Sequence, residues 1–454
     1  MIRIFHTNDI HSNFKCFSKI AEAISKKKDL NTLVLDAGDF ADFKDVGLQG
    51  TNGRKACDLL KEAGYDAWTI GNNEMFAGKK VLEEMISYSE VPMLSANLRN
   101  LDGSRIKDLK DSIIVEKNLN KFLIIGLSPN LGEFLELDGF SIIDNEEAIK
   151  NVLEENKGNF DYCILLTHIG RSFDNKLCEN IKEIDLIIGG HSHHLDDSII
   201  ICNDTPMHMA GEFGQNLGEV LFDINDKTKS IGSQIKSDKY TENREINRII
   251  EKDNLEAYKN LSKTIAKLDI DLWHDVIEEN PMTNFIADAL CKYTNSKISI
   301  INSGIVNGGL KKGNISMKKL IEICPSPLNV TCFDIMVKDL LEAIENSLLS
   351  EVCLKDGRGP GFRGKYVGRI HFSGLILSSE NSKCILLDKN QNKLNENAFI
   401  RVASSDYLQR GSGYISMRNN KNVKYYKPYI RHLISMYIED KEILGKSYLS
   451  RVDM

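Results

Sequence analysis

The sequence lacks any apolar run of about eighteen residues or more, so no membrane-spanning helix is expected. It also shows no secretory leader, because residues 1–6 have the pattern of a strand and not of a charged segment followed by an apolar one. The ten cysteines are scattered without a CxxC pair, which favours reduced, mostly buried thiols over a disulfide framework. We therefore expect a cytoplasmic protein with no membrane partner.

The sequence also lacks a strong charge of one sign. The net charge is -7 over 454 residues, so no general attraction to nucleic acid is expected, and any affinity for phosphate groups must be local. Hydrophobic residues make up 42% and charged residues 27% of the chain, which is typical of a globular protein. The length indicates two or three domains, and the sequence leaves the oligomeric state open.

The first half of the chain alternates apolar runs with amphipathic stretches, a pattern typical of a layered α/β domain. The predicted helices cover residues 18–27, 53–63, 77–89 and 146–155. The predicted strands cover residues 2–5, 32–36, 122–126, 162–167 and 185–189.

The second half has a different pattern. Residues 241–265 are rich in charge and free of Gly and Pro, which indicates a long helix that either connects two domains or begins the second one. Beyond it, residues 338–349 predict an amphipathic helix, and residues 367–375 and 399–403 predict strands. The predicted domains are residues 1–235, a connecting helix at 236–265, and an α+β domain at 266–454.

Seven polar side chains lie just after the carboxyl ends of predicted strands or in the short loops that follow. In open α/β sheets, ligand-binding sites form at this edge. Together they offer carboxylate, amide and imidazole ligands. Such a set suits two divalent cations about 3.5–4 Å apart, the arrangement used to attack phosphoryl groups. The candidate metal ligands are Asp9, His11, Asp39, Asn72, His168, His191 and His193.

These motifs resemble those of the metallophosphatase and 5'-nucleotidase family, which includes UDP-sugar hydrolases. The opening His6-Thr7-Asn8-Asp9-Ile10-His11-Ser12 is similar to the first motif of that family, and Ser95-Ala96-Asn97-Leu98 and Gly189-Gly190-His191-Ser192-His193 are similar to later ones. The resemblance implies a calcineurin-like metallophosphatase α/β/α sandwich followed by a 5'-nucleotidase substrate domain, with an active site in the cleft between them.

The resemblance also implies the role of each ligand. Asp9, His11, Asp39 and His193 hold one metal, while Asp39 bridges to a second metal held by Asn72, His168 and His191. Two close cations lower the pKa of a bound water, and the resulting hydroxide attacks phosphorus. Mn, Zn, Mg and Fe all fit this donor set.

The chain departs from the family at the catalytic dyad. The family places a His beside the Asn ligand and an Asp that orients it, whereas this chain has Asn73 and Phe76 there. An Asn donates a hydrogen bond but is no general acid, and general acids contribute about 10²–10⁴-fold. The enzyme is therefore slow, or prefers leaving groups that need no proton, or takes the proton from another residue. The candidates for that residue are His194, His208 and His371.

The second domain departs as well. Asn302-Ser303-Gly304 is similar to a family motif, but the Arg that usually follows is missing. Arg369 stands where the family often has a Phe that stacks on one side of the nucleotide base. By the resemblance, Tyr414 is the aromatic ring that stacks on the other side of the base. On a strand, Arg369, His371 and Ser373 face the same side. The predicted substrate-binding residues are Asn302, Arg369, His371 and Tyr414. The alternative is that Arg369 and His371 merely lie on an exposed strand face and bind no substrate.

The sequence thus predicts a two-metal phosphohydrolase for a small nucleotide or nucleotide-like ester or pyrophosphate, with Asp39 and Asn73 as catalytic residues. Two alternatives stay open at this point. One is a metal-binding regulatory protein that turns over poorly, and the other is a phosphodiesterase for cyclic nucleotides.

Overall fold

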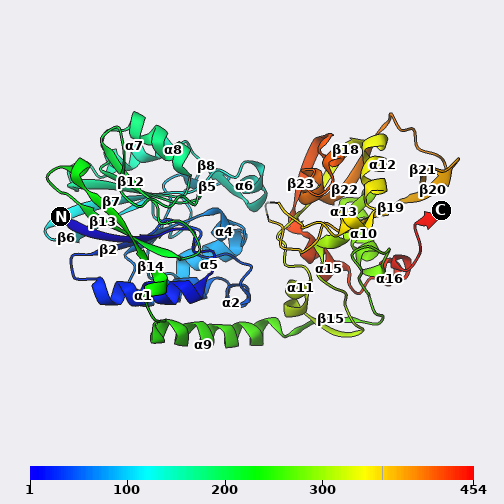
Figure 1. Ribbon diagram of the computed structural model, residues 1–454, viewed down its shortest axis with the longest axis horizontal. Coiled ribbons are helices and arrows are strands. Elements are labelled where there is room, and N and C mark those ends of the chain that lie inside the picture. The colour runs from blue at the N-terminus through cyan, green and yellow to red at the C-terminus, as the bar shows by residue number, and fades with distance from the viewer. Residues whose placement is uncertain (360, 454) are drawn as a thin grey trace. The chain divides into compact units, whose positions relative to one another are not determined.

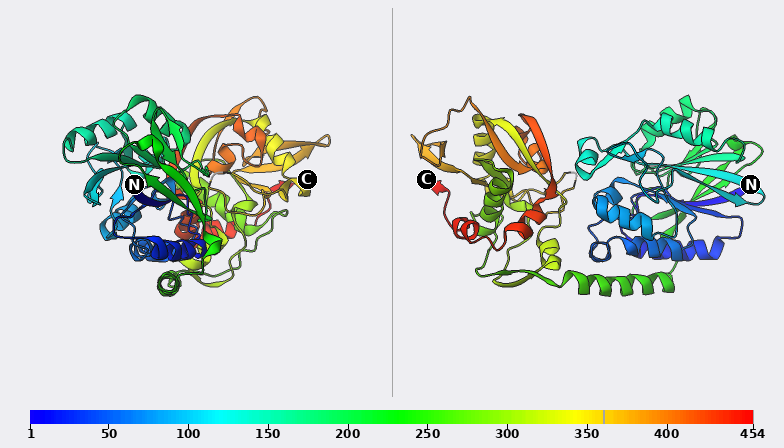
Figure 2. Two further views of the ribbon diagram at one scale, coloured as in Figure 1. Left: turned by 60° about the vertical axis from the view of Figure 1, so that its left-hand side comes forward. Right: turned by 180° about the vertical axis from the view of Figure 1, so that it is seen from behind.

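The structure is a computed structural model that describes residues 1–359 and 361–453. It divides into two compact units, Met1–Asn260 and Leu261–Met454, here called the first and the second unit. The helix α9 (Arg244–Leu261) ends at this division and lies within the predicted helix at 241–265. Figure 2 shows α9 in green as one unbroken helix. In the described part of the chain, no helix is long and apolar enough to cross a membrane.

Two six-stranded sheets form the centre of the first unit (Figure 1). In spatial order, the first sheet consists of β14 (Ile231–Lys236), β13 (Asn216–Phe222), β1 (Ile2–Thr7), β2 (Leu33–Asp36), β3 (Ala67–Thr69) and β4 (Met93–Leu94). The second sheet consists of β11 (Ile200–Cys202), β12 (Thr205–His208), β10 (Leu186–Gly189), β9 (Tyr162–Thr167), β7 (Asn120–Leu127) and β6 (Ser112–Lys117). The strands from β1 to β4 run parallel, as do β7, β9, β10 and β12, so their carboxyl ends share an edge in each sheet.

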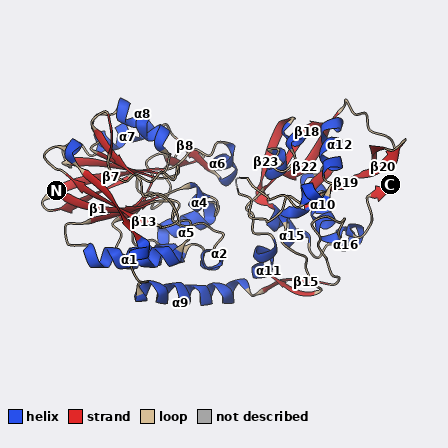
Figure 3. Ribbon diagram, in the orientation of Figure 1, coloured by secondary structure: helices blue, strands red, loops and turns tan. Residues whose placement is uncertain are grey.

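Alternate residues of the strands enter different cores, because successive side chains point to opposite faces of a sheet. Ile4 of β1 and Ile124 of β7 belong to the core between the two sheets. Phe5 lies in the core under α1 (Phe14–Lys27), α3 (Arg54–Glu62) and α5 (Lys79–Tyr88), and Ile125 in the core under α7 (Asn145–Glu155) and α8 (Arg171–Asn180). Figure 3 shows helices on both outer sides of the strands. The predicted α/β sandwich is confirmed, and its central layer is two sheets.

Short helices and one small ribbon complete the first unit. Asn13 caps α1 by accepting a hydrogen bond from the backbone of Cys16, which explains why the helix begins at Phe14, earlier than predicted. The remaining elements are α2 (Val46–Thr51), α4 (Asn72–Met75), α6 (Glu133–Asp138) and the paired strands β5 (Leu98–Asn100) and β8 (Phe140–Ile142).

The second unit is α+β, as predicted. Its five-stranded sheet has the order β19 (Ile370–Ser373), β16 (Ser299–Asn302), β22 (Phe399–Ser405), β18 (Asn329–Met336) and β23 (Asn420–Tyr429). Two smaller sheets hold β15 (Thr264–Leu268) with β17 (Gly313–Ser316), and β21 (Lys383–Asp388) with β20 (Leu375–Glu380) and β24 (Val452–Asp453). Its helices are α10 (Pro281–Thr294), α11 (Met317–Ile323), α12 (Val337–Asn346), α13 (Ser350–Cys353), α14 (Asp406–Gln409), α15 (Ile430–Tyr437) and α16 (Lys441–Ser447).

One predicted strand is divided. The expected strand at 367–375 is interrupted at Gly374, between β19 and β20. Gly374 has a φ of 79°, and a Cβ there would lie 2.0 Å from the carbonyl oxygen of Lys297. Only glycine fits this close approach, so the chain turns from one sheet into another at this point.

Candidate metal centre

The seven candidate ligands lie on loops that follow parallel strands of the first unit. Asp9 and His11 follow β1, and Asp39 follows β2. Asn72 begins α4, shortly after β3, while His168 follows β9 and the pair His191 and His193 follows β10. Ligands from both sheets thus reach one place, because the carboxyl ends of the parallel strands face it.

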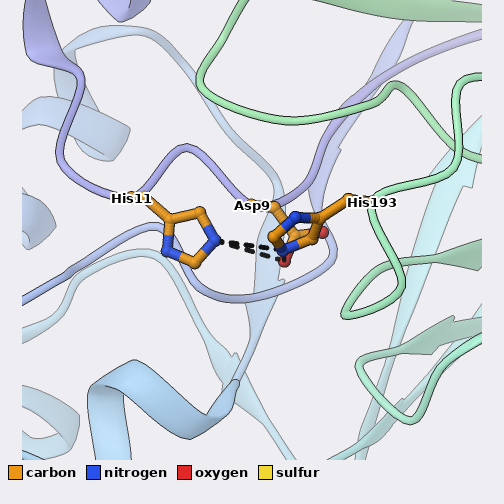
Figure 4. Close-up of side chains that lie close together, drawn as sticks. All are labelled: Asp9, His11 and His193. Carbon is orange, nitrogen blue, oxygen red and sulfur yellow. Dashed lines mark hydrogen bonds and ion pairs between the residues drawn. The ribbon is translucent and has the colours of Figure 1, made fainter. Parts of the chain in front are cut away.

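Asp9, His11 and His193 form the first group of ligands (Figure 4). Asp9 Oδ1 lies 3.7 Å from His11 Nε2 and 3.2 Å from His193 Nε2. The two imidazole Nε2 atoms are 3.3 Å apart. Figure 4 shows both rings pointing at the carboxylate. Three lone-pair atoms from residues far apart in the sequence therefore converge, as the ligands of a cation do.

Asp9, Asp39 and His168 form the second group, and Asp9 belongs to both. His168 Nε2 lies 3.4 Å from Asp39 Oδ2 and 3.8 Å from Asp9 Oδ1. The remaining two candidates are beside it: His191 Nδ1 lies 3.0 Å from Asn72 Oδ1, and the His191 ring is 5.2 Å from that of His168. Asp39 Oδ2 also lies 4.0 Å from His11 Nδ1, between the two groups.

Two buried atoms of the site have no hydrogen-bond partner, Asp9 Oδ1 and His168 Nε2. The other oxygen of Asp9 accepts hydrogen bonds from the side chain of Asn8 and the backbone of His191. The other nitrogen of His168, Nδ1, lies 2.7 Å from the carbonyl oxygen of Ala37 and donates to it, so Nε2 is the nitrogen that would offer its lone pair to a cation after losing its proton. A buried polar atom without a partner is costly, and a divalent cation would satisfy both. The residues present therefore fit the metal that the family implies.

Left-handed backbone gathers at this site. Non-glycine residues in that region cost about 1–3 kcal/mol each and cluster at functional sites. In each of these loops, the left-handed conformation makes a sharp turn that directs the ligand side chain toward the site. The candidate ligands with positive φ are Asp9 (52°), His11 (48°), Asp39 (54°), His191 (72°) and His193 (55°).

Glycines let the loops approach the ligands closely. A Cβ at Gly38 would lie 2.7 Å from His168 Nδ1, and one at Gly190 would lie 2.8 Å from the same atom. A Cβ at Gly71 would lie 2.2 Å from Asp39 Oδ1. These distances are shorter than any carbon contact allows, so the compactness of the site depends on glycine at all three positions.

The two carboxylates set the charge of His168. Burial by itself would lower the pKa of its imidazole, but Asp39 and Asp9 raise that pKa to about 10. In the same way, burial would raise the pKa of Asp39, but His168 holds it well below its usual range. Without metal, a proton on His168 thus compensates the carboxylates, and a cation would take over that role.

Asn73, which stands in place of the family's His, points into this cluster. Its side-chain amide donates to Asp39 Oδ2 at 2.6 Å and lies 3.1 Å from His11 Nδ1, and its backbone N–H donates to Asp39 Oδ1 at 2.8 Å. The residue is buried. Asn73 therefore positions Asp39 from two directions, and it carries no titratable proton.

Two of the three alternative proton donors are buried. His208 pairs with the buried His6 at 2.7 Å, and burial lowers the pKa of His208 to about 4. Burial also lowers the pKa of His371 well below its usual value. A neutral, enclosed imidazole is a poor general acid near neutral pH. His194 is exposed, and its Nδ1 lies 2.9 Å from the hydroxyl of Ser192.

The predicted substrate residues of the second unit are mostly enclosed in it. Asn302 is fully buried and donates its amide to the carbonyl oxygen of Val367 at 2.6 Å. Tyr414 is 3% exposed and donates its hydroxyl to the carbonyl oxygen of Gly368 at 2.7 Å. Both side chains therefore support the loop at Val367 and Gly368, and their contact with a substrate stays a prediction.

His371 and Ser373 share one face of β19, as the strand pattern predicts, but α10 covers that face. His371 lies 2.9 Å from Asn284 Oδ1 and 3.3 Å from Asn280 Nδ2, and Ser373 donates to Asp288 at 2.6 Å. The expectation of an exposed strand face is therefore wrong for His371. Arg369 comes before β19 and is half-buried, with its guanidinium 3.4 Å from the carbonyl oxygen of Ile277. It stays the more accessible candidate.

Two glutamates of the first unit were not identified as site residues from the sequence. Glu74 is buried and accepts backbone hydrogen bonds from Asp39, Ala41 and Gly71, at 3.2, 2.8 and 2.8 Å, so it joins the loops that carry Asp39 and Asn72. Its position three residues after Gly71, as in a capping box, is a signal that could have found it. Glu212 lies 2.6 Å from His193 Nδ1, and nothing in its sequence context marks it.

Family models match both parts of the chain. Residues 2–195 match the model of the calcineurin-like phosphoesterases, and residues 260–419 match that of the 5'-nucleotidase C-terminal domain. The first match holds all seven candidate ligands.

Individual relatives agree with these matches. The chain is 27% identical to the uncharacterized metallophosphoesterase YunD of Bacillus subtilis, over 96% of this chain and 98% of that protein. It is 29% identical to the trifunctional nucleotide phosphoesterase YfkN of the same organism, over 76% of this chain but only 27% of that longer protein. The fold is similar to that of the NAD nucleotidase of Haemophilus influenzae, with a TM-score of 0.65, 15% identity, and coverage of 100% of this chain and 99% of that one. Residues 2–195 therefore form a calcineurin-like metallophosphoesterase domain and residues 260–419 a 5'-nucleotidase C-terminal domain, and together these matches identify the chain as a metal-dependent phosphoester hydrolase.

Proposed function

We propose that this hydrolase uses two metal ions and acts on nucleotides or nucleotide-like phosphate esters and pyrophosphates. The observation that carries the two-metal part is the pair of ligand groups that share Asp9, with the unpartnered atoms Asp9 Oδ1 and His168 Nε2 facing them. Mixed carboxylate, amide and imidazole ligands are accepted by Mn, Zn, Fe and, more weakly, Mg.

Each ligand has a place in this proposal. Asp9, His11, Asp39 and His193 would hold one cation, and Asp39, Asn72, His168 and His191 would hold the other. The bridging role of Asp39 is supported by its Oδ2 atom, which faces His168 in one group and His11 in the other. When bound, two divalent cations activate water as a nucleophile and neutralise charge on the phosphoryl oxygens.

The protein's own contribution is to hold these ligands in place before the substrate arrives. Asn73 and Glu74 fix the Asp39 loop through hydrogen bonds, and the Ala37 carbonyl fixes the tautomer of His168. Asp9, Asp39 and His168 are at most 2% exposed, so little water competes for them. Fixed ligands need no rearrangement during the reaction, which is the main source of electrostatic catalysis.

Asn73 shapes the substrate preference. Because it donates a hydrogen bond but no proton, a leaving group must depart as an anion of low basicity. A phosphate or nucleotide released from a pyrophosphate meets this condition, whereas the alkoxide of a simple monoester does not. We therefore propose pyrophosphates and activated esters as the better substrates. Arg369, as a half-buried cation, is the candidate contact for the phosphate or base of a nucleotide.

The test is phosphate or nucleotide release in the presence of Mn²⁺ from five substrates in parallel: AMP, ADP, UDP-glucose, NAD and a 2',3'-cyclic nucleotide. The Asp39→Asn protein serves as the blank. Turnover of ADP, UDP-glucose or NAD well above that of AMP supports the proposal. Turnover confined to the cyclic nucleotide would replace it with a phosphodiesterase, and two bound metals without any turnover would replace it with a metal-binding regulatory protein.

A further inference from the structure

Among the ion pairs of the described residues, Glu212 is the only carboxylate outside the candidate ligand set that contacts a ring nitrogen of a candidate ligand. Its Oε2 atom lies 2.6 Å from His193 Nδ1. The opposite nitrogen of the same ring, Nε2, lies 3.2 Å from Asp9 Oδ1 and 3.3 Å from His11 Nε2. The imidazole of His193 thus connects Glu212 on one side with the first ligand group on the other.

The loop that carries Glu212 is held between two ligand loops. The backbone N–H of Phe213 donates to the carbonyl oxygen of Asp9 at 2.8 Å, and the backbone N–H of Gly211 donates to the carbonyl oxygen of His194 at 2.9 Å. The side chain of Asn8 donates to the carbonyl oxygen of Gly211 at 2.7 Å. The residues on either side of Glu212 are therefore tied to the loops that carry Asp9 and His193.

This anchoring continues on the far side of the loop. Asn13 donates its amide to the carbonyl oxygen of Phe213 at 2.9 Å, and the Phe213 ring lies 5.5 Å from the ring of His11. Phe213 has a φ of 54°, a left-handed conformation that makes the turn after Glu212 tight. The Glu212 backbone is thus positioned by the first ligand group and by the residues next to it in the same loops.

The chemistry of imidazole gives this contact a function. A ring nitrogen binds a metal only through its lone pair, so the proton must be on the other nitrogen. A carboxylate that accepts this proton fixes the tautomer and the ring orientation and makes the ligand more basic. The side chain of Glu212 is 36% exposed, so it contributes little to the core and is free to act in this way.

We propose that Glu212 is the positioning residue of His193, which it orients through Nδ1 so that Nε2 binds the metal held with Asp9 and His11. This inference rests on the metal centre of the proposed function but not on its substrate. Loss of such a partner weakens metal binding by about 10- to 100-fold. The cation of the second group, held by His168 and His191, is expected to keep its affinity.

The experiment is a Mn²⁺ titration of the metal-stripped full-length protein, in which free metal and bound metal per chain are measured. The variants are Glu212→Ala, which removes the acceptor, and Glu212→Gln, which keeps an acceptor oxygen but not the charge. Glu90→Ala is the matched control, because Glu90 is an exposed glutamate of the same unit that pairs only with a surface lysine among the described ion pairs. The melting temperature of each metal-free variant shows whether folding is intact.

We expect the wild-type protein and the Glu90→Ala variant to bind two ions. In Glu212→Ala, one of the two sites should weaken about 10- to 100-fold while the other is unchanged, and Glu212→Gln should bind closer to wild type. Wild-type affinity at both sites in Glu212→Ala would overturn the inference, as would equal loss in Ala and Gln. A wild-type protein that binds no second ion would instead overturn the two-metal proposal, so the two failures are distinguishable.

Discussion

Two buried histidines, His168 in the first unit and His371 in the second, have similar burial but opposite environments. His168 faces two carboxylates, and its Nε2 atom has no hydrogen-bond partner. His371 has amide partners on both ring nitrogens, from Asn284 and Asn280. Its pKa is lowered mainly by burial and further by nearby arginines. Burial alone therefore does not indicate the role of a histidine. The role is indicated by the groups that contact its two ring nitrogens.

The same contrast separates the two sets of predicted site residues. Several candidate ligands of the first unit direct polar atoms at one another from left-handed backbone, an arrangement that a bound cation would stabilise. Asn302 and Tyr414 in the second unit each donate a hydrogen bond to a neighbouring loop, although Asn302 Oδ1 is also buried without a partner. Five experiments test this comparison.

The largest effect is expected from Asp39→Asn. This change removes a negative charge that the two proposed cations share, and stabilisation by the metals is worth several kcal/mol, so turnover should fall by about 10³-fold or more. Bound metal, measured by elemental analysis after dialysis, should fall as well. Asp238→Asn, at an exposed aspartate of the same unit, is the control. Full activity of Asp39→Asn would contradict the two-metal proposal.

The second experiment concerns pH. Because the carboxylates raise the pKa of His168 to about 10 in the metal-free protein, a proton must leave this residue before a cation binds. Metal affinity is therefore expected to rise about tenfold for each pH unit between pH 7 and pH 9. Titration at several pH values measures this slope. The exposed His194→Gln variant should keep it, and a flat profile in the wild-type protein would contradict the assignment of His168.

The same shift predicts how stability depends on pH. The folded-state pKa of His168 lies above its ordinary value of 6.5, so its pairing with Asp39 and Asp9 stabilises the metal-free protein fully below pH 6.5. That stabilisation is lost as the pH rises through about 10. The melting temperature of the metal-free protein should therefore fall between pH 7 and pH 10, and His168→Gln should flatten this decline.

A smaller effect is expected from Asn73→His. The substitution introduces a titratable ring, but Phe76 stands where the family has the carboxylate that orients it. The gain in kcat on AMP should stay below about tenfold, less than the 10²–10⁴-fold that a well-positioned general acid supplies. The double variant Asn73→His with Phe76→Asp should gain more. A large gain from the single change would show that no orienting carboxylate is needed.

The smallest kinetic effect is expected from His371→Ala. It removes the partner of the buried Asn284 Oδ1, whereas Asn280 keeps its bonds to the carbonyl oxygens of Asp275 and Glu278. The free energy of unfolding should therefore fall by about 1–3 kcal/mol, as measured by urea denaturation. Bound metal and kcat on AMP should not change. If His371 were the general acid, kcat would fall by about 10²–10⁴-fold while the metal stayed in place.

The sequence alone was sufficient for much of the fold and for the composition of the candidate site. Apolar alternation is local, so the five predicted strands match β1, β2, β7, β9 and β10 to within a few residues, and α9 lies within its predicted range. The shorter strands β3 and β4 and the strands β11 to β14 were not predicted. The ligands could be selected because each follows an apolar run. The division of one strand at Gly374 was not predictable, because it depends on the approach of Lys297 from elsewhere in the chain.

Contacts between distant segments decided the rest. Asp9 lies in both groups of converging ligand atoms, and Asp39 Oδ2 faces His168 as well as His11. Glu212 reaches His193 because its loop is tied to the loop of Asp9. Whether a buried histidine presents a free nitrogen depends on partners such as Ala37 for His168 and Asn284 for His371, which lie 131 and 87 residues away. Residue type and spacing therefore specify which ligands are available, while packing of distant loops decides which lone pairs remain free, because one hydrogen bond is enough to occupy a nitrogen.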